Sequence, residues 1–207
     1  MKTEPTSARP FIPAKATLKQ LAEASRHCEG CELYLYATQT VFGQGPKKAK
    51  IMLVGEQPGD KEDLAGAPFV GPAGKILDQA LEDAGIDRDI VYLTNAVKHF
   101  RFEERGKRRI HKKPSGTNIS ACRPWLEAEI NQVKPETIVC LGATATQSLA
   151  GRDVRVLKDR GKWIPTTLAK RLIVTIHPSA LLRLPETASY EDEYASFVAD
   201  LRHAIDP

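Results

Sequence analysis

The chain has 207 residues, of which 42% are hydrophobic and 27% are charged, and its formal net charge is +4. This length and composition indicate one folded domain and exclude a chain that is disordered throughout. No apolar run approaches the roughly 20 residues that cross a bilayer, and we find no secretory signal, so we expect a cytoplasmic protein with reduced cysteines.

The N-terminal segment and the domain that follows differ in composition. Residues 1–16 are rich in proline, so we predict a flexible tail there and a folded domain over residues 17–207. Thr17 and Gln20 then form a capping-box pattern, which predicts a helix directly after Thr17.

Four short apolar segments predict buried strands, and amphipathic segments between them predict helices. The strand segments lie within 49–55, 90–97, 136–142 and 170–176. The helical segments lie within 71–86, 118–134, 143–150 and 190–205. Strands that alternate with helices predict an α/β fold, here a single three-layer α/β/α domain with a mostly parallel four-stranded sheet.

Polar side chains follow three of the predicted strands directly. They are Glu56, Gln57 and Asp60, then Asn95 and His99, and finally His177 and Ser179. Ligands of parallel sheets bind beyond the carboxyl ends of the strands, so we expect these residues to form one site.

The basic residues are concentrated in one segment. Residues 98–113 hold eight Lys or Arg and two Glu, a local net charge of +6, whereas the rest of the chain sums to −2. This favours a polyanionic partner, and a solvated loop is the alternative. His111 lies inside this segment, where nearby cations favour a neutral ring that suits a nucleophile, a base, a metal ligand or no role.

The four cysteines are Cys28, Cys31, Cys122 and Cys140. They fit a tetrathiolate site for zinc or an iron–sulfur cluster, and their spacing does not choose between the two metals. A redox pair at Cys28 and Cys31, or a core position for Cys140, is the alternative.

Five features in chain order resemble the uracil-DNA glycosylase superfamily, most of all its iron–sulfur family 4 branch. They are the four cysteines, "GEQPG" at 55–59, "PFVGPAGKILD" at 68–78, "TNAVKHF" at 94–100 and "HPSALL" at 177–182. Gln57 stands where ordinary family 4 members carry Ala, and the basic loop is longer than theirs. Both departures resemble the UdgX subgroup, whose hallmark is a covalent bond between the loop histidine and uracil-containing DNA.

The resemblance implies a uracil-DNA glycosylase that excises uracil and becomes linked through His111 to C1′ of the abasic deoxyribose. Glu56 would be a catalytic residue that orients the His111 ring and stabilises its positive charge after attack, and His177 would donate to uracil O2. The implied uracil-binding residues are Gln57, Asp60, Phe69 and Asn95. The implied phosphate contacts are Lys107, Arg108, Arg109, Lys112 and Lys113.

The resemblance also implies a cofactor and a partner. The cofactor is an iron–sulfur cluster, expected as [4Fe-4S], on Cys28, Cys31, Cys122 and Cys140. The partner is uracil-containing DNA, single-stranded or with the base flipped out, and we expect a monomer.

Two other functions fit the same residues. A conventional glycosylase would use water and turn over many times, with His111 only a DNA contact. A non-catalytic iron–sulfur module would bind uracil-containing and thymine-containing strands equally.

Overall fold

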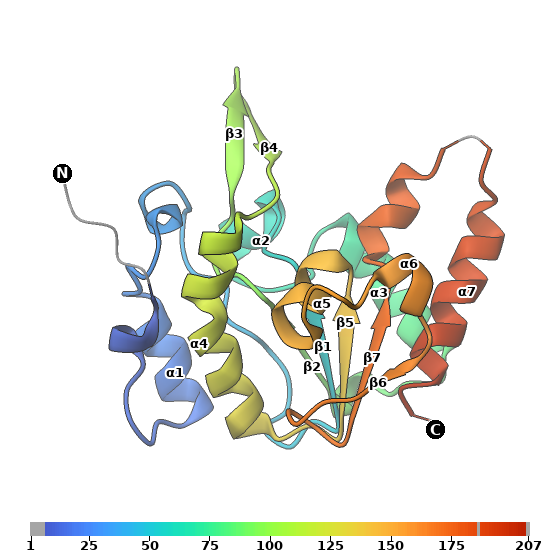
Figure 1. Cartoon of the computed structure of the whole chain (residues 1–207). Helices are drawn as coiled ribbons and strands as arrows, with labels where there is room; N and C mark the ends of the chain where they lie inside the picture. Colours follow the sequence, from blue (N-terminus) through green and yellow to red (C-terminus); the bar gives the residue numbers. More distant parts are fainter. Residues whose placement is uncertain (1–6, 186, 206–207) are drawn as a thin grey trace.

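The computed structural model describes residues 7–185 and 187–205 and contains a five-stranded sheet between two layers of helices (Figure 1). The strands are β1 (Ile51–Gly55), β2 (Val91–Asn95), β5 (Thr137–Leu141), β6 (Trp163–Ile164) and β7 (Arg171–Thr175). Their order is β2-β1-β5-β7-β6, and all pairs are parallel except β6 with β7. The predicted α/β/α fold is confirmed, but the strand number is wrong, because a two-residue edge strand leaves no pattern in the sequence.

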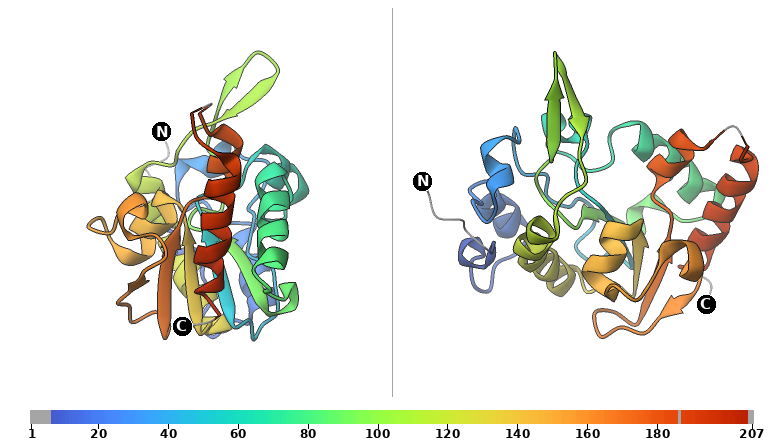
Figure 2. Two further views of the ribbon diagram at one scale, coloured as in Figure 1. Left: turned by 90° about the vertical axis from the view of Figure 1, so that its right-hand side faces the viewer. Right: turned by 45° about the horizontal axis from the view of Figure 1, so that its top comes forward.

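Helices cover both faces of the sheet (Figure 2). They are α1 (Leu18–Ser25), α2 (Asp60–Ala65), α3 (Pro72–Asp83), α4 (Gly116–Val133), α5 (Ala143–Ala150), α6 (Val156–Asp159) and α7 (Tyr190–Arg202). Alternate residues of β1 pack on opposite faces: Ile51 and Leu53 contact the cluster that includes α3 and α7, whereas Met52 and Val54 contact α4 and α5. Among the described residues, no helix combines the length and the apolar composition that crossing a bilayer needs.

Two helices begin at capping boxes. Thr17 and Gln20 cap α1, as the sequence predicts, and Ser115 with Asn118 caps α4 two residues before its expected start. The described residues also form short 3-10 helices: η1 (Arg9–Phe11), η2 (Glu32–Leu35), η3 (Arg88–Ile90) and η4 (Pro178–Arg183).

The predicted N-terminal tail is ordered over residues 7–16, and residues 1–6 lie outside the described part of the chain. Ala8 is 1% exposed, and its N–H donates to the Ala121 carbonyl at 2.7 Å. Ala8 and Ala16 belong to a third apolar cluster with α1 and the first half of α4. The prediction of a flexible tail is therefore wrong for residues 7–16, because apolar contacts outweigh the proline-rich composition.

The basic segment forms a β-hairpin rather than a loop. It consists of β3 (Phe102–Arg105) and β4 (Arg108–His111), which project above the sheet (Figures 1 and 2). Gly106 and Lys107 make the two-residue turn, and Gly106 has a φ of +59°, which a glycine adopts at little cost. His111 is the last residue of β4 and pairs with Phe102.

Candidate active site

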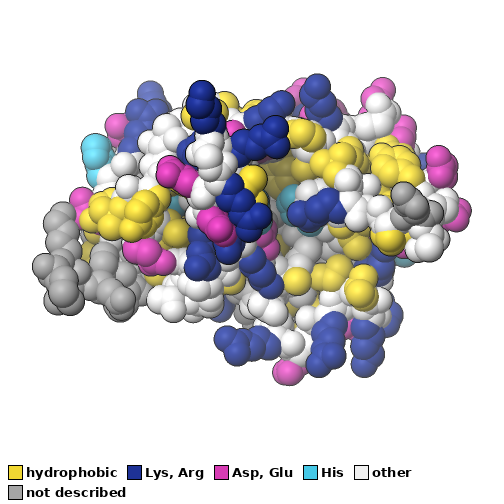
Figure 3. All heavy atoms as spheres, turned by 90° about the horizontal axis from the view of Figure 1, so that it is seen from above, with side chains coloured by type: hydrophobic (Ala, Val, Ile, Leu, Met, Phe, Trp, Pro, Cys, Tyr) yellow, Lys and Arg dark blue, Asp and Glu magenta, His cyan; other side chains and the backbone are white. Residues whose placement is uncertain are grey.

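A cavity of about 660 Å³ opens at the carboxyl ends of the parallel strands. Glu56 and Asn95 reach it from the ends of β1 and β2, His177 from the segment after β7, and His111 from the hairpin. Seen from above, Lys and Arg side chains surround a hollow on this face (Figure 3). The site therefore lies where the parallel sheet predicts it.

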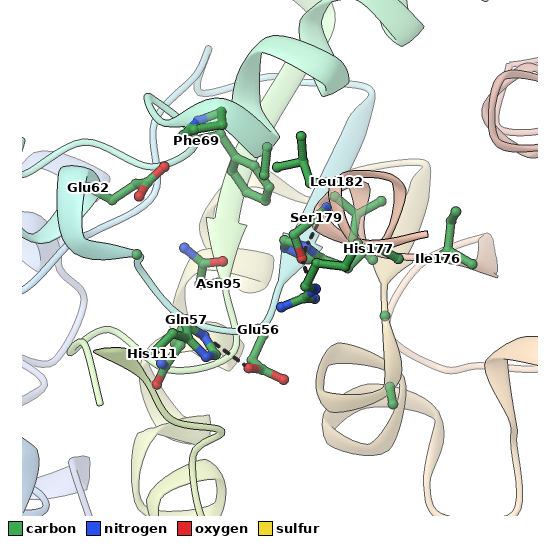
Figure 4. Close-up of a pocket in the computed structure, with 18 of the residues that line it drawn as sticks. Glu56, Gln57, Glu62, Phe69, Asn95, His111, Ile176, His177, Ser179 and Leu182 are labelled. Carbon is green, nitrogen blue, oxygen red and sulfur yellow. Dashed lines mark hydrogen bonds and ion pairs between the residues drawn. The ribbon is translucent and has the colours of Figure 1, made fainter. Parts of the chain in front are cut away.

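The aromatic ring of Phe69 and the carboxamide of Asn95 both line the cavity. Phe69 and Asn95 are 9% and 3% exposed, and both point toward the same space as His177 (Figure 4). The Phe69 and His177 rings are stacked with centroids 6.0 Å apart. Gly55 makes this arrangement possible, because a Cβ there would lie 2.4 Å from Asn95 Oδ1 and 2.7 Å from Phe69 Cζ.

The hydrogen bonds of His177 indicate its tautomer. Its Nδ1 accepts from the Ser179 N–H at 3.2 Å and lies 2.8 Å from Ser179 Oγ. Arg183 donates to the same hydroxyl oxygen at 2.9 Å. Burial lowers the pKa of His177 to about 4, with a further contribution from Arg183. The ring is therefore neutral at pH 7, with its proton on Nε2.

His111 and Glu56 face each other beside the cavity (Figure 4). His111 Nε2 lies 3.3 Å from Glu56 Oε1, and the Thr144 hydroxyl donates to Glu56 Oε2. Burial lowers the pKa of His111, Glu56 opposes this shift, and Arg183 adds to it. The ring is neutral as predicted, but the causes are burial and Arg183 rather than the cations of the hairpin.

Gln57 holds the base of the hairpin. Its Nε2 donates to the carbonyls of Arg101 and Lys112, at 3.1 Å and 3.0 Å, and its Oε1 accepts from the Arg101 N–H at 3.1 Å. The side chain borders the cavity, yet both ends of its carboxamide are already engaged. The predicted role in uracil binding is therefore corrected: Gln57 positions the strand that ends at His111.

Arg109 anchors the same hairpin to α2. It donates to Asp60 Oδ1 and Asp63 Oδ2, both at 2.6 Å, and its guanidinium lies over the rings of Phe100 and Phe102. Asp63 is 0% exposed, so this contact is shielded from water. The charge of Arg109 is already paired, so this structure favours a role in holding the hairpin over the predicted phosphate contact. Asp60 borders the cavity but is likewise engaged by Arg109.

The other predicted phosphate contacts remain accessible. Lys107, Arg108, Lys112 and Lys113 are exposed. Lys112 pairs with Glu103 at 2.6 Å on the surface of the hairpin, where ion pairs are weak and exchange readily. These four side chains form a basic group on the hairpin that carries His111.

Three of the four cysteines gather in one place. Cys28, Cys31 and Cys122 are buried in the third apolar cluster. Cys28 Sγ accepts from Trp125 Nε1–H at 3.1 Å, and Cys122 Sγ accepts from the Lys98 N–H at 3.2 Å. Hydrogen bonds to sulfur are typical of cluster ligands. Among the described residues, no group of His, Cys, Asp and Glu is spaced to hold a single metal ion.

Cys140 does not join the other cysteines. It lies within β5, is 0% exposed and packs in the cluster with Met52 and Val54. Burial raises the pKa of both Cys122 and Cys140; the nearby Cys31 and Cys28 add to the shift of Cys122, and no other cysteine contributes to that of Cys140. The predicted fourth ligand is therefore corrected to a core residue, which was the alternative from the sequence.

The structure also revises which polar residues belong to the site. His99 is 6% exposed and does not line the cavity. Thr144 and Arg183 do contribute to the site, and neither was predicted from the sequence. Thr144 follows the end of β5, so the rule that found the other strand-end residues also applies to it.

Comparisons with known proteins agree with this architecture. The profile of the uracil DNA glycosylase superfamily matches residues 42–202. A type-4 uracil-DNA glycosylase of Thermotoga maritima is 39% identical over 79% of this chain and 82% of its own length. One from Pyrobaculum aerophilum is 36% identical over 92% of this chain and 98% of its own length. With its matching fold and strand-end cavity, this chain belongs to the uracil-DNA glycosylase superfamily.

Proposed function

We propose that this protein is a uracil-DNA glycosylase, which breaks the bond between uracil N1 and C1′ of deoxyribose in DNA. The observation that carries this proposal is the convergence of Phe69, Asn95 and His177 on one cavity. The names of the similar proteins from Thermotoga maritima and Pyrobaculum aerophilum state the same activity.

Phe69 and Asn95 would recognise the base. A planar pyrimidine would stack on the face of the Phe69 ring, while Asn95 Oδ1 would accept from N3–H and Nδ2 would donate to O4. The base can enter only after it leaves the DNA stack, so the substrate is single-stranded or has its uracil flipped out.

His177 would stabilise the departing uracil. As the bond to N1 breaks, C1′ gains oxocarbenium character and the electron pair moves onto the base. Nε2–H of the neutral His177 ring then donates to O2, where negative charge develops.

His111 would capture the sugar. Its unprotonated ring nitrogen forms a bond to C1′, and the electron pair of the broken bond leaves with uracil as the anion. The alkylated ring carries a positive charge and keeps its remaining N–H, and the Glu56 carboxylate faces that charge. Water hydrolyses a glycosyl ester, but a bond to imidazole has no such exit, so each molecule reacts once.

The basic group on the hairpin would hold the DNA backbone. Lys107, Arg108, Lys112 and Lys113 are exposed there, and exposed cations bind phosphates without regard to sequence.

Cys28, Cys31 and Cys122 would hold an iron–sulfur cluster, which we expect as [4Fe-4S]. Their sulfurs lie in an apolar shell with N–H donors directed at them, which fits thiolate ligands. The cluster's part would be structural: it would join the N-terminal segment, α4 and the loop after β2.

His99 is our candidate for the fourth ligand. It is buried and follows Lys98, whose N–H already contacts Cys122 Sγ. No hydrogen bond joins its ring to another described residue, so a ring nitrogen is available to iron. Imidazole is a known cluster ligand.

Uracil release from a labelled oligonucleotide tests the proposed activity. The protein should release uracil from a uracil-containing strand and leave a matched thymine-containing strand intact. Asn95→Ala should slow release by about 100-fold or more while DNA affinity is kept, because the base edge is no longer read. Asn131→Ala is the matched control, because Asn131 is exposed on α4 and does not border the cavity. Equal affinity for both strands without released uracil would instead indicate a DNA-binding module.

A further inference from the structure

A buried ion pair lies beside the proposed base-reading residue. Lys98 Nζ is 2.5 Å from Glu129 Oε2, and the two side chains are 1% and 0% exposed. Lys98 is part of the basic segment in the sequence, but its charge is inside the protein. Buried charges are costly unless every donor and acceptor is satisfied, so the pair needs a reason beyond stability.

The ammonium group of Lys98 is fully hydrogen-bonded. Besides Glu129, it donates to Thr94 Oγ1 at 2.6 Å and to the Asn95 carbonyl at 2.8 Å. All three N–H bonds are therefore used, and two of them hold consecutive residues at the end of β2.

Glu129 is held equally tightly. Its Oε1 accepts from the Gly43 N–H at 2.8 Å and from the Tyr92 hydroxyl at 3.1 Å. A Cβ at Gly43 would lie 2.5 Å from Glu129 Oε1, so the carboxylate sits in a closely packed space. Glu129 thus fixes the position of the Lys98 ammonium relative to α4.

Asn95 itself depends on its backbone for its orientation. Its carboxamide makes no hydrogen bond to the described residues and borders the cavity. Its main chain is paired with Gly55 on one side and held by Lys98 Nζ through the carbonyl. A shift of this carbonyl would turn the carboxamide away from the base.

We propose that Lys98, held by Glu129, is a positioning residue for Asn95 and so sets how precisely the uracil edge is read. This inference rests on the proposed glycosylase function. The Lys98 N–H also contacts Cys122 Sγ, so one residue links the cysteine group to the base-reading position.

The test removes both charges together, because removing one alone would leave the other buried and unpaired. The variant combines Lys98→Met with Glu129→Gln, and it is made in the unmodified protein and in Asn95→Ala. The matched control combines Arg160→Met with Asp200→Asn, which removes a 2.9 Å ion pair between residues that do not border the cavity. Single-turnover uracil release, affinity for a thymine-containing strand and thermal unfolding are measured for each protein.

We expect the double variant Lys98→Met with Glu129→Gln, called the charge-free variant, to slow uracil release by about 10-fold or more with unchanged DNA affinity. A small misplacement of a substrate-binding group can have an effect of this size. When the same two substitutions are added to Asn95→Ala, they should cause no further slowing. The control substitutions should cause no slowing in the unmodified protein or in Asn95→Ala. Equal slowing in both backgrounds, or a folded variant with full activity, would overturn the proposal. If this double variant does not fold, Lys98→Gln combined with Glu129→Gln replaces it, because that pair also removes both charges but keeps polar side chains, and it should slow uracil release likewise.

A failure of the glycosylase function is recognised separately, because the unmodified protein would then release no uracil. In that case the Asn95 side-chain amide resonance, assigned by its loss in Asn95→Ala, still reports the positioning role. The two N–H signals of this amide should be sharp and single in the unmodified protein, and broadened or split in the charge-free variant. An unchanged resonance would overturn the proposal.

Discussion

His111 Nε2 lies 3.3 Å from Glu56 Oε1, although His111 ends the hairpin and Glu56 follows β1. The Thr144 hydroxyl donates to the other carboxylate oxygen, which leaves Oε1 to the imidazole. In the proposed reaction, the Glu56 side chain would therefore already face the ring when positive charge develops on it.

Glu56→Gln should slow formation of the covalent adduct by about 100-fold, because the alkylated imidazolium loses its countercharge. Time courses on denaturing gels measure this rate. Glu104→Gln, at an exposed position in the hairpin, is the control and should react normally. An unchanged rate in Glu56→Gln would remove Glu56 from the mechanism.

Arg109→Ala and Arg108→Ala should have different effects, although the residues are neighbours in β4. Arg109→Ala frees the hairpin from Asp60 and Asp63 and misplaces His111, so less adduct should form per uracil released. Arg108→Ala should weaken binding of all DNA alike and lower the salt slope by about 1. Nitrocellulose filter binding at several salt concentrations, with gels for the adduct, separates the two. The opposite pattern would mean that Arg109 contacts phosphate.

Adduct formation and uracil release should depend differently on pH. The pKa of His111 is lowered from 6.5, and a protonated ring has no lone pair for C1′. Adduct formation should therefore be complete at neutral pH and fall as the pH drops through a midpoint below 6.5. Because Glu56 raises the pKa of His111, Glu56→Gln should move this midpoint lower still.

Uracil release by His111→Ser should continue at pH values so low that the unmodified protein no longer forms the adduct. His177 has a pKa of about 4 and keeps its neutral form across this range. Both rates are measured in one buffer series. A shared midpoint for the two processes would show that His111 does not set the acid limit.

Cys122→Ala and Cys140→Ala should differ in iron content. Cys122→Ala should lose the bound iron and the visible absorbance of the anaerobically purified protein, and His99→Ala should lower both. Cys140→Ala should keep both and lose only some stability, because its thiol packs in the core of the sheet. Loss of iron in Cys140→Ala would return Cys140 to the ligand set.

The sheet and most of the cavity could be predicted from the sequence. Continuous apolar runs such as 51–55 are typical of parallel strands covered on both faces, and β1 occupies that range. Asn95 and His177 then follow from one rule, that the carboxyl ends of parallel strands share an edge. Local signals were enough for these features.

The hairpin and the cysteine group depend on contacts that are distant in the sequence. The pairing of Phe102 with His111 is supported by bonds from Gln57, which lies more than forty residues away. Charge alone could not separate Arg109, paired with the buried Asp63, from the exposed Arg108. Cysteine spacing likewise does not reveal which face of β5 Cys140 occupies.

The measurement that tests covalent capture most directly is the mass of the protein–DNA peptide after reaction with a uracil-containing oligonucleotide. The unmodified protein should yield one adduct, on the peptide that contains His111, with that peptide heavier by the mass of the abasic strand less one water. His111→Ser should yield no adduct yet still release uracil, because Asn95 and His177 are untouched and water can enter the vacated space. An adduct on another residue, or the same adduct in His111→Ser, would contradict the assignment of His111 as the nucleophile.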